Sequence, residues 1–377
     1  MVQTSQVIVE TLDAKQGKIG ILTLNAEKTL NSLTLEMVGA LTTTLAMWAE
    51  DESIAIIVLK GAGDKAFCAG GDVQKLYESS ISETSGPRKY AEQFFCEEYQ
   101  LNYLIHTYTK PILCLATGIV MGGGLGLMAG ASHRVTNERT RIAMPEITIG
   151  LFPDVGGTWF LNKMPYALGI FFALTGASVN APDALITGLA DFFLDTKTIA
   201  KLEDTLIRET WSVDSRENHR LLSSLLHKNN ETDQATHNHV TSELKPYLAE
   251  ISKACHETSL GEVITALQHL QIDSEWFKRS IKTLMIGSPL SSVLIFEQLR
   301  RHRHSALTTV FESELQLATN IVRHTEFAEG VRALLIDKDK QPKWQHQHFS
   351  EVSNTLLESF FRAPWEGGAE ANPLRLS

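Results

Sequence analysis

Two carboxylates stand close together in an otherwise apolar stretch of the chain. Glu146 and Asp154 lie eight positions apart (154 − 146) within Met144–Gly157, and each directly follows a proline. Burial disfavours the charged form of a carboxylate, so such residues are costly in apolar surroundings unless they are paired or used. The pattern therefore indicates acid–base or nucleophilic chemistry at a pocket wall. The alternative is structural, with Glu146 at a helix start and Asp154 as a helix cap.

Two glycine-rich turns have the chemistry that would complement those acids. The segment Lys65–Asp72 follows the apolar run Ile54–Lys60, and Met121–Gly126 follows the apolar run Pro111–Ala116. Consecutive glycines let the backbone approach a ligand, and the free N–H groups at a helix start attract negative charge. Two such turns after adjacent strands can form an oxyanion hole, in which each donor contributes roughly 10²–10³ in rate. For the first segment alone, a tight turn capped by Asp72 is the alternative.

The second glycine turn also matches a dinucleotide-binding pattern. Gly124-Leu-Gly126-Leu-Met-Ala129 fits G-x-G-x-x-A, and Glu146 follows Gly126 by twenty residues (146 − 126). That interpretation requires an uninterrupted helix and then a complete strand before the acid. The intervening Ser132–Thr140 indicates a strand and a turn instead, so we keep the dinucleotide site only as a rival hypothesis.

The first half of the chain alternates between strand-like and helix-like segments. Thr34–Glu50 has apolar residues at helical spacing and begins with a capping threonine. Strands are predicted at Lys18–Leu24, Ile54–Lys60, Pro111–Ala116 and, as one short strand, Arg134–Thr136 with Arg141–Ala143. Repeated strand–turn–helix units predict an α/β core in which helices cover the sheet.

After about residue 195 the sequence no longer shows the apolar runs that predict strands. The polar segments Ser79–Arg88 and Lys228–His239 are predicted to be a mobile loop and a solvated connection. We therefore predict two parts, a core over residues 1–200 and a helical C-terminal region over residues 201–377 that packs on it. Helices are predicted in the second part at Leu202–Leu226, Gly261–Leu270, Ser291–His302 and Val310–Arg323.

Composition excludes several classes of protein. The net charge of −10 argues against a nucleic-acid partner. The four cysteines form no CxxC pair, and this spacing indicates a reduced, cytoplasmic setting without a zinc site. The first residues resemble neither a signal nor a transit peptide. Pro111–Ala131 is uncharged and long enough to cross a membrane, but five glycines in it favour a strand, a turn and a buried helix. We expect no metal and no membrane partner.

Taken together, these motifs resemble the crotonase (enoyl-CoA hydratase/isomerase) superfamily, whose members act on coenzyme A thioesters. Within it, the closer resemblance is to the 3-hydroxyisobutyryl-CoA hydrolase branch, and it extends from about Val7 to Trp344. The superfamily motifs are Ala66–Asp72, Met121–Gly124 and Pro145–Glu146, and those of the branch are Phe95–Tyr99, Gly150–Gly157 and Glu329–Trp344.

The resemblance implies a fold and a set of site residues. The fold would be a ββα-repeat spiral with an added helical C-terminal region. The backbone amides of Gly71 and Gly123 would hold the thioester oxygen, Glu146 and Asp154 would be the catalytic carboxylates, and Glu98 would line the substrate pocket. Coenzyme A would be part of the acyl-CoA substrate, so no separate cofactor is expected, and a homo-oligomer stays open.

One departure from the superfamily pattern bears on the reaction. Hydratases that resemble this core carry a second glutamate three residues past the middle glycine, where this chain has Gly126, and they lack an acid at the position of Asp154. The resemblance therefore implies hydrolysis of a short β-hydroxyacyl-CoA rather than water addition to a double bond. Glu146 would act as nucleophile or as general base. The rivals are a hydratase or isomerase and a non-catalytic CoA-binding protein.

Overall fold

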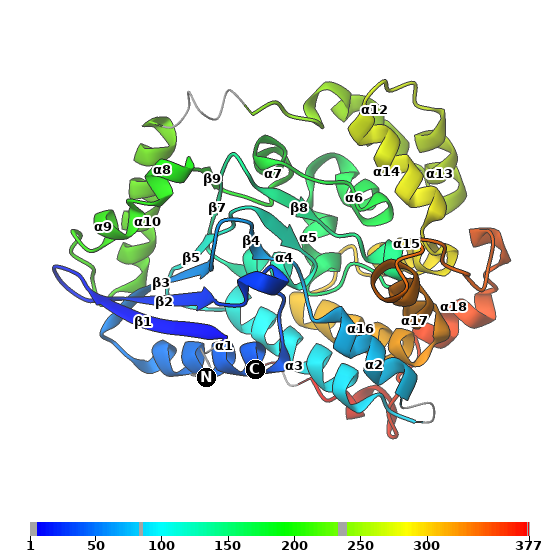
Figure 1. The fold of residues 1–377 in the computed structure, drawn as a ribbon, viewed down its shortest axis with the longest axis horizontal. Helices are drawn as coiled ribbons and strands as arrows, with labels where there is room; N and C mark the ends of the chain where they lie inside the picture. The colour runs from blue at the N-terminus through cyan, green and yellow to red at the C-terminus, as the bar shows by residue number, and fades with distance from the viewer. Residues whose placement is uncertain (1–5, 83–85, 233–239, 375, 377) are drawn as a thin grey trace. The chain divides into compact units, whose positions relative to one another are not determined.

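The computed structural model describes residues 6–82, 86–232, 240–374 and 376 (Figure 1). The chain divides into two compact units that interleave along the sequence. Unit 1 comprises Met1–Gly71, Leu104–Ile142 and Val179–Lys245, and unit 2 comprises Asp72–Tyr103, Ala143–Ser178 and Pro246–Ser377. The sequence-based boundary near residue 200 stays a prediction about where the core of the fold ends.

Unit 1 contains a six-stranded sheet in the order β1-β2-β3-β5-β7-β9. Neighbouring strands are parallel except for the antiparallel pair β1–β2. The first six residues of β3 are buried, as expected for a strand that is covered on both faces. The strands are β1 (Val7–Asp13), β2 (Lys18–Leu24), β3 (Ile54–Gly61), β5 (Ile112–Leu115), β7 (His133–Thr136) and β9 (Phe192–Phe193).

Helices of unit 1 pack on this sheet. Helix α1 (Leu35–Glu50) begins as predicted, with Thr34 Oγ1 accepting the Met37 N–H at 3.2 Å. Leu222 and Leu226 of α10 (Ser215–Thr232) belong to the same buried cluster as the sheet residues. The other helices of the unit are α4 (Gly123–Gly130), α7 (Ala181–Thr187), α8 (Thr196–Ile199) and α9 (Leu202–Leu206).

A second, three-stranded sheet has the order β4-β6-β8, with β4 (Ala66–Cys68), β6 (Ile119–Met121) and β8 (Arg141–Ala143). The prediction that the first glycine turn directly follows Ile54–Lys60 was wrong, because β4 intervenes. The single strand predicted from Arg134 to Ala143 was also wrong: it is divided between β7 and β8, which lie in different sheets. Strands of three or four residues are too short to show a hydrophobic period.

The apolar run Pro111–Ala131 folds as predicted into a strand, a turn and a buried helix. It contains β5, β6 and α4. At Gly118, where φ is +70°, an added Cβ would lie 2.3 Å from the Lys65 carbonyl oxygen, so only glycine fits this close approach. No helix in the part of the chain that the structure describes is long and apolar enough to cross a membrane.

Unit 2 is largely helical, as predicted for the C-terminal region. From the first half of the chain it takes α2 (Val73–Ser82), most of α3 (Lys89–His106), α5 (Gly157–Lys163) and α6 (Leu168–Thr175). Its later helices are α12 (Leu248–Cys255), α13 (Leu260–His269), α14 (Glu275–Ile286), α15 (Pro289–Arg301), α16 (Leu307–Arg323), α17 (Thr325–Val331) and α18 (Asn354–Phe360).

Three predicted boundaries need correction. The helix predicted over Leu202–Leu226 is two helices, α9 and α10, separated by the segment that carries the buried Trp211. The predicted loop Ser79–Arg88 begins inside α2, and residues 83–85 lie outside the described residues. The predicted connection Lys228–His239 begins inside α10, and residues 233–239 likewise lie outside them. In the second and third cases the polar composition of the segment did not reveal where the helix ends.

Candidate active site

Three of the predicted site residues lie in unit 2 and are buried. Glu98 on α3 is 2% exposed, Glu146 is 5% exposed and Asp154 is 4% exposed. Glu146 begins a 3₁₀ turn, Glu146–Ile149, which ends at Gly150 with φ +68°. An added Cβ at Gly150 would lie 2.5 Å from the carbonyl oxygen of Glu326, so α17 packs tightly against this turn. The turn that begins at Glu146 is therefore held against α17 at its C-terminal end.

Asp154 is held by a hydrogen bond to its side chain. The hydroxyl of Tyr99 donates to Asp154 Oδ2 at 2.6 Å. Helix α5 starts only at Gly157, and Asp154 accepts the Gly157 N–H through its backbone carbonyl, so the alternative of a side-chain helix cap is not observed. Val155 has φ +54°, an unfavourable region for a β-branched residue that costs about 1–3 kcal/mol. Strained backbone of this kind is concentrated at functional sites.

All three of these carboxyl groups have a raised pKa. Burial, and then the charge of Asp154, raise the pKa of Glu98 and of Glu146 well above the ordinary value. Burial also raises the pKa of Asp154 to about 6, although the hydrogen bond from Tyr99 opposes this. Mutual repulsion means that the group titrates as a unit and holds protons at a pH where exposed carboxylates hold none.

No basic side chain relieves this repulsion. Among the described residues, no ion pair includes Glu98, Glu146 or Asp154. Within those same residues, Glu98 Oε1 and Glu146 Oε2 are buried without a hydrogen-bond partner. Buried polar atoms are nearly always paired, so these oxygens are available to a substrate.

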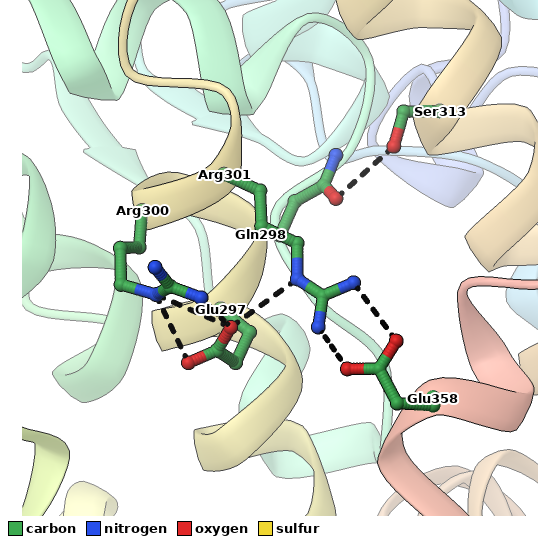
Figure 2. A network of polar contacts seen from close by, with 6 residues as sticks. All are labelled: Glu297, Gln298, Arg300, Arg301, Ser313 and Glu358. Atoms are coloured by element: carbon green, nitrogen blue, oxygen red, sulfur yellow. Dashed lines mark hydrogen bonds and ion pairs between the residues drawn. The ribbon is translucent and has the colours of Figure 1, made fainter.

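Two other carboxylates of unit 2, Glu297 and Glu358, have a lowered pKa instead. Figure 2 shows that Arg301 forms ion pairs with both Glu297 and Glu358, and that Arg300 forms an ion pair with Glu297. Burial alone would raise the pKa of Glu297, but hydrogen bonds from both arginines bring it below the ordinary value. The hydrogen bond from Arg301 likewise lowers the pKa of Glu358. This network stabilises the contact of α15 with α18. Among the described residues, Glu98, Glu146 and Asp154 have no arginine or lysine partner, and they are therefore suited to chemistry.

The raised pKa of Asp154 predicts a pH-dependent stability. Its value is 3.8 in the unfolded chain and about 6 in the folded protein, so the folded protein binds more protons in this window. The free energy of unfolding therefore falls as the pH rises from about 4 to 6 and stays lower above it. We expect Asp154→Asn to gain stability relative to the wild type, by on the order of 1–3 kcal/mol, between pH 4 and pH 8.

Urea unfolding of both proteins at the two pH values measures this effect. The intrinsic effect of the asparagine does not depend on pH, so the change between the two pH values reports the loss of the Asp154 carboxyl group together with its repulsion of Glu98 and Glu146. A difference that is equal at pH 4 and pH 8 would contradict the raised pKa.

The two predicted oxyanion turns both lie in unit 1, and the structure brings them together. They follow β4 and β6, which are adjacent parallel strands. An added Cβ at Gly70 would lie 3.3 Å from the Met121 carbonyl oxygen and 3.8 Å from the Gly123 nitrogen. Gly71 bridges to Leu33, whose N–H donates to Gly70 at 2.8 Å, so the first turn is anchored.

Gly123 is the first residue of α4, so its N–H belongs to the first helical turn. The N–H groups of Leu125 and Gly126 donate to the carbonyl of Gly122, which has φ +47° and precedes the helix. The amides of a first turn have no acceptor within the helix and can bind an anion. The two glycine turns thus lie together in unit 1, and the three buried carboxylates lie in unit 2.

The dinucleotide alternative does not fit this geometry. Its glycines, Gly124 and Gly126, lie inside α4 rather than in a turn before a helix. The helix ends at Gly130, and β7 and β8 both precede Glu146, so the acid does not end a single strand that follows the helix. In the described part of the chain, no group of three or more His, Cys, Asp or Glu is arranged to hold a metal ion.

Sequence reasoning missed two residues of the carboxylate site. Tyr99 was not identified as a site residue, but it is buried and donates to Asp154. Glu314 on α16 was not considered, although it is fully buried beside the residues that follow Asp154. Its position was a usable signal, because Glu314 stands among the buried residues Val310, Phe311, Leu317 and Ala318 of an amphipathic helix.

Comparison with known proteins identifies the family of this chain. The family model described as enoyl-CoA hydratase/isomerase matches residues 19–361. The chain belongs to this family. Among curated members, the human "3-hydroxyisobutyryl-CoA hydrolase, mitochondrial" is 37% identical over 94% of this chain and 89% of its own length. The Arabidopsis thaliana "Probable 3-hydroxyisobutyryl-CoA hydrolase 3" is 32% identical over 96% of this chain and 92% of its own.

Two solved structures with similar sequences share the fold. A carnitinyl-CoA dehydratase from Mycobacterium thermoresistibile is similar with a TM-score of 0.80 at 29% identity, covering 97% of this chain and 98% of that one. An enoyl-CoA hydratase from Rhodobacter sphaeroides has a TM-score of 0.78 at 28% identity, covering 95% and 97%. The predicted fold is confirmed: a crotonase-like α/β core with a largely helical C-terminal region.

Proposed function

We propose that this enzyme hydrolyses a short β-hydroxyacyl-CoA thioester, with 3-hydroxyisobutyryl-CoA as the leading substrate, to the free hydroxy acid and coenzyme A. The observation that carries the proposal is the buried pair Glu146 and Asp154, whose pKa values are raised and which no described ion pair neutralises. Relatives of 36–38% identity that are named 3-hydroxyisobutyryl-CoA hydrolase support the choice of substrate.

In the proposed reaction, the N–H groups of Gly71 and Gly123 hold the thioester oxygen. They stabilise the negative charge that forms there when the carbonyl carbon is attacked. As a general base, Glu146 takes a proton from water while the oxygen of that water bonds to the carbon. The carbon–sulfur bond then breaks, and the coenzyme A thiolate leaves and takes up the proton. Asp154 binds the β-hydroxyl of the substrate, and Glu98 lines its pocket.

A second route begins with direct attack of Glu146 on the carbonyl carbon. This expels the thiolate and leaves a mixed anhydride, which water then hydrolyses. Single-turnover hydrolysis in ¹⁸O-labelled water, followed by mass analysis of the peptide that contains Glu146, separates the two routes. Hydrolysis of the anhydride at the Glu146 carbonyl would leave label in Glu146, whereas base catalysis puts label only in the product.

Hydration of an enoyl-CoA is the second candidate, because the similar solved structures include one titled enoyl-CoA hydratase. Water addition in the hydratases that resemble this core uses a second glutamate, and here that position is Gly126, buried inside α4. A panel of 3-hydroxyisobutyryl-, 3-hydroxypropionyl- and crotonyl-CoA tests the choice. Thiol release from the hydroxyacyl-CoA substrates supports hydrolysis. Loss of the crotonyl-CoA absorbance at a comparable rate would favour the hydratase.

A non-catalytic CoA-binding protein is the alternative from a different class. In that case Glu146→Ala and Asp154→Ala would leave any biological activity intact, whereas the enzyme requires both groups. A cytoplasmic location, a role in valine degradation and the absence of a separate cofactor remain predictions, and a homo-oligomer stays open. Several relatives have names that include the word mitochondrial. Cell fractionation, growth on valine, activity after dialysis and light scattering test the four in turn.

A further inference from the structure

Helix α16 supplies a buried carboxylate to the backbone next to Asp154. Glu314 is 0% exposed, and its two oxygens accept from two backbone amides. The Gly156 N–H donates to Oε2 at 2.7 Å, and the Thr158 N–H donates to Oε1 at 2.9 Å. These amides lie two and four residues after Asp154, so one side chain fixes the turn that carries the catalytic acid.

The same helix also supports the side chain of Asp154. Phe311 lies three residues before Glu314 on α16, and its ring packs on that of Tyr99 with 6.1 Å between centroids. Tyr99 in turn donates its hydroxyl hydrogen to Asp154. Residues three apart share a helix face, so one face of α16 reaches Asp154 by two routes. One route goes through the backbone, and the other goes through the tyrosine.

The turn after Asp154 needs this support. Val155 and Gly156 both have positive φ, +54° and +83°, so two successive residues adopt the left-handed conformation. A non-glycine residue rarely adopts this conformation unless its surroundings impose it. Glu314 provides such a constraint, because a carboxylate that accepts two amides fixes both their direction and their spacing.

Glu314 is a costly residue for a purely structural role. Burial, opposed by the hydrogen bonds from Thr158 and Gly156, raises the pKa of Glu314 to about 8, and the nearby charge of Asp154 adds to the rise. A residue that served only to fill the core would be apolar at this position of α16. A strained group supported by a buried polar residue is the usual arrangement behind a precisely placed catalytic side chain.

We propose that Glu314 is a positioning residue: it fixes the turn Asp154–Thr158 so that the Asp154 carboxyl group meets the β-hydroxyl of the substrate. It thereby sets the preference of the enzyme for 3-hydroxyacyl over plain acyl thioesters. This inference rests on the proposed hydrolysis and on the assigned role of Asp154.

The first test compares two substrates that differ by one hydroxyl group, 3-hydroxyisobutyryl-CoA and isobutyryl-CoA. Glu314→Gln can accept through only one atom, so we expect its kcat/KM for the hydroxylated substrate to fall about 10- to 100-fold, the range for a misplaced catalytic group. The value for isobutyryl-CoA should fall much less. Glu314→Asp, which keeps the carboxylate on a shorter side chain, should lie between the wild type and Glu314→Gln.

Glu312→Gln is the matched control, because Glu312 is an exposed carboxylate two positions earlier on α16. It should leave both substrates unaffected. The second test is a double-mutant cycle with Asp154→Asn. In that background Glu314→Gln should change kcat/KM by less than about threefold, because residues that act as one unit are not additive. Additive losses, or equal losses for both substrates, would overturn the positioning role.

Amide hydrogen exchange separates this inference from the proposed function. The N–H groups of Gly156 and Thr158 should exchange faster in Glu314→Gln than in Glu312→Gln, whatever the activity. If that holds but the wild type hydrolyses none of the thioesters, the proposed function fails and the anchoring by Glu314 stands. If the wild type is active and the exchange of the two amides is unchanged in Glu314→Gln, the inference itself fails.

Discussion

Replacing Glu146 by glutamine is expected to lower kcat for 3-hydroxyisobutyryl-CoA by about 10²–10⁴-fold. A group that takes the proton from water, or that attacks the carbonyl carbon, contributes about 10²–10⁴ in rate, and an amide does neither. KM should change little, because glutamine has nearly the same shape. Thiol release with a chromogenic thiol reagent measures both constants.

The folded state should tolerate this change. Burial raises the pKa of Glu146, because the charged form of its carboxyl group is unfavourable in this environment. A neutral glutamine does not have this cost. The free energy of unfolding should therefore be equal to that of the wild type or higher. Glu257→Gln, at an exposed position of the same unit, is the control and should leave kcat unchanged. If Glu146→Gln kept more than about a tenth of the wild-type kcat, Glu146 would have no chemical role.

The carboxylate site was predictable as far as its residue types were unusual for their surroundings. Glu146 and Asp154 stood out because acids are rare in apolar segments, and Glu98 because the resemblance marked it. Tyr99 gave no such signal, since a tyrosine on an apolar helix face is ordinary, and only the fold shows that its hydroxyl points at Asp154. Glu314 was detectable in principle, as an acid in the buried stripe of α16, but its partners are 158 and 156 residues away in sequence.

The fold was predictable where elements are long or strongly patterned. The buried run that forms β3 and the amphipathic pattern that forms α1 were both found. The small sheet was missed because β4, β6 and β8 have three residues each, and their pairing depends on contacts between strands rather than on local pattern. This sheet matters for the proposed reaction, since β4 and β6 lead directly into the turns that contain Gly71 and Gly123.

The oxyanion turns give the second large prediction, at Gly124. An added Cβ there would lie 2.2 Å from the carbonyl oxygen and 2.8 Å from the Cβ of Cys68, both parts of β4. These atoms belong to a buried strand and cannot rotate away, so Gly124→Ala must push α4 off β4. The amide of Gly123 is adjacent and would move with it. We expect kcat to fall about 10²–10³-fold, the effect of one lost oxyanion donor.

The same clash should destabilise the protein by about 1–3 kcal/mol, the usual cost of overpacking. Activity is therefore compared per folded molecule, with the folded fraction taken from urea unfolding.

Gly39→Ala isolates the steric effect, because it makes the same substitution inside another helix of unit 1. Gly39 lies in α1, and an added Cβ there meets no atom within 4 Å. Alanine is the better helix former, so this variant should gain about 0.5–1 kcal/mol and keep its kcat. A Gly124→Ala protein that is folded and as active as Gly39→Ala would mean that the Gly123 amide does not contribute to the oxyanion hole. Loss in Gly124→Ala alone would show that catalysis depends on the close contact of α4 with β4.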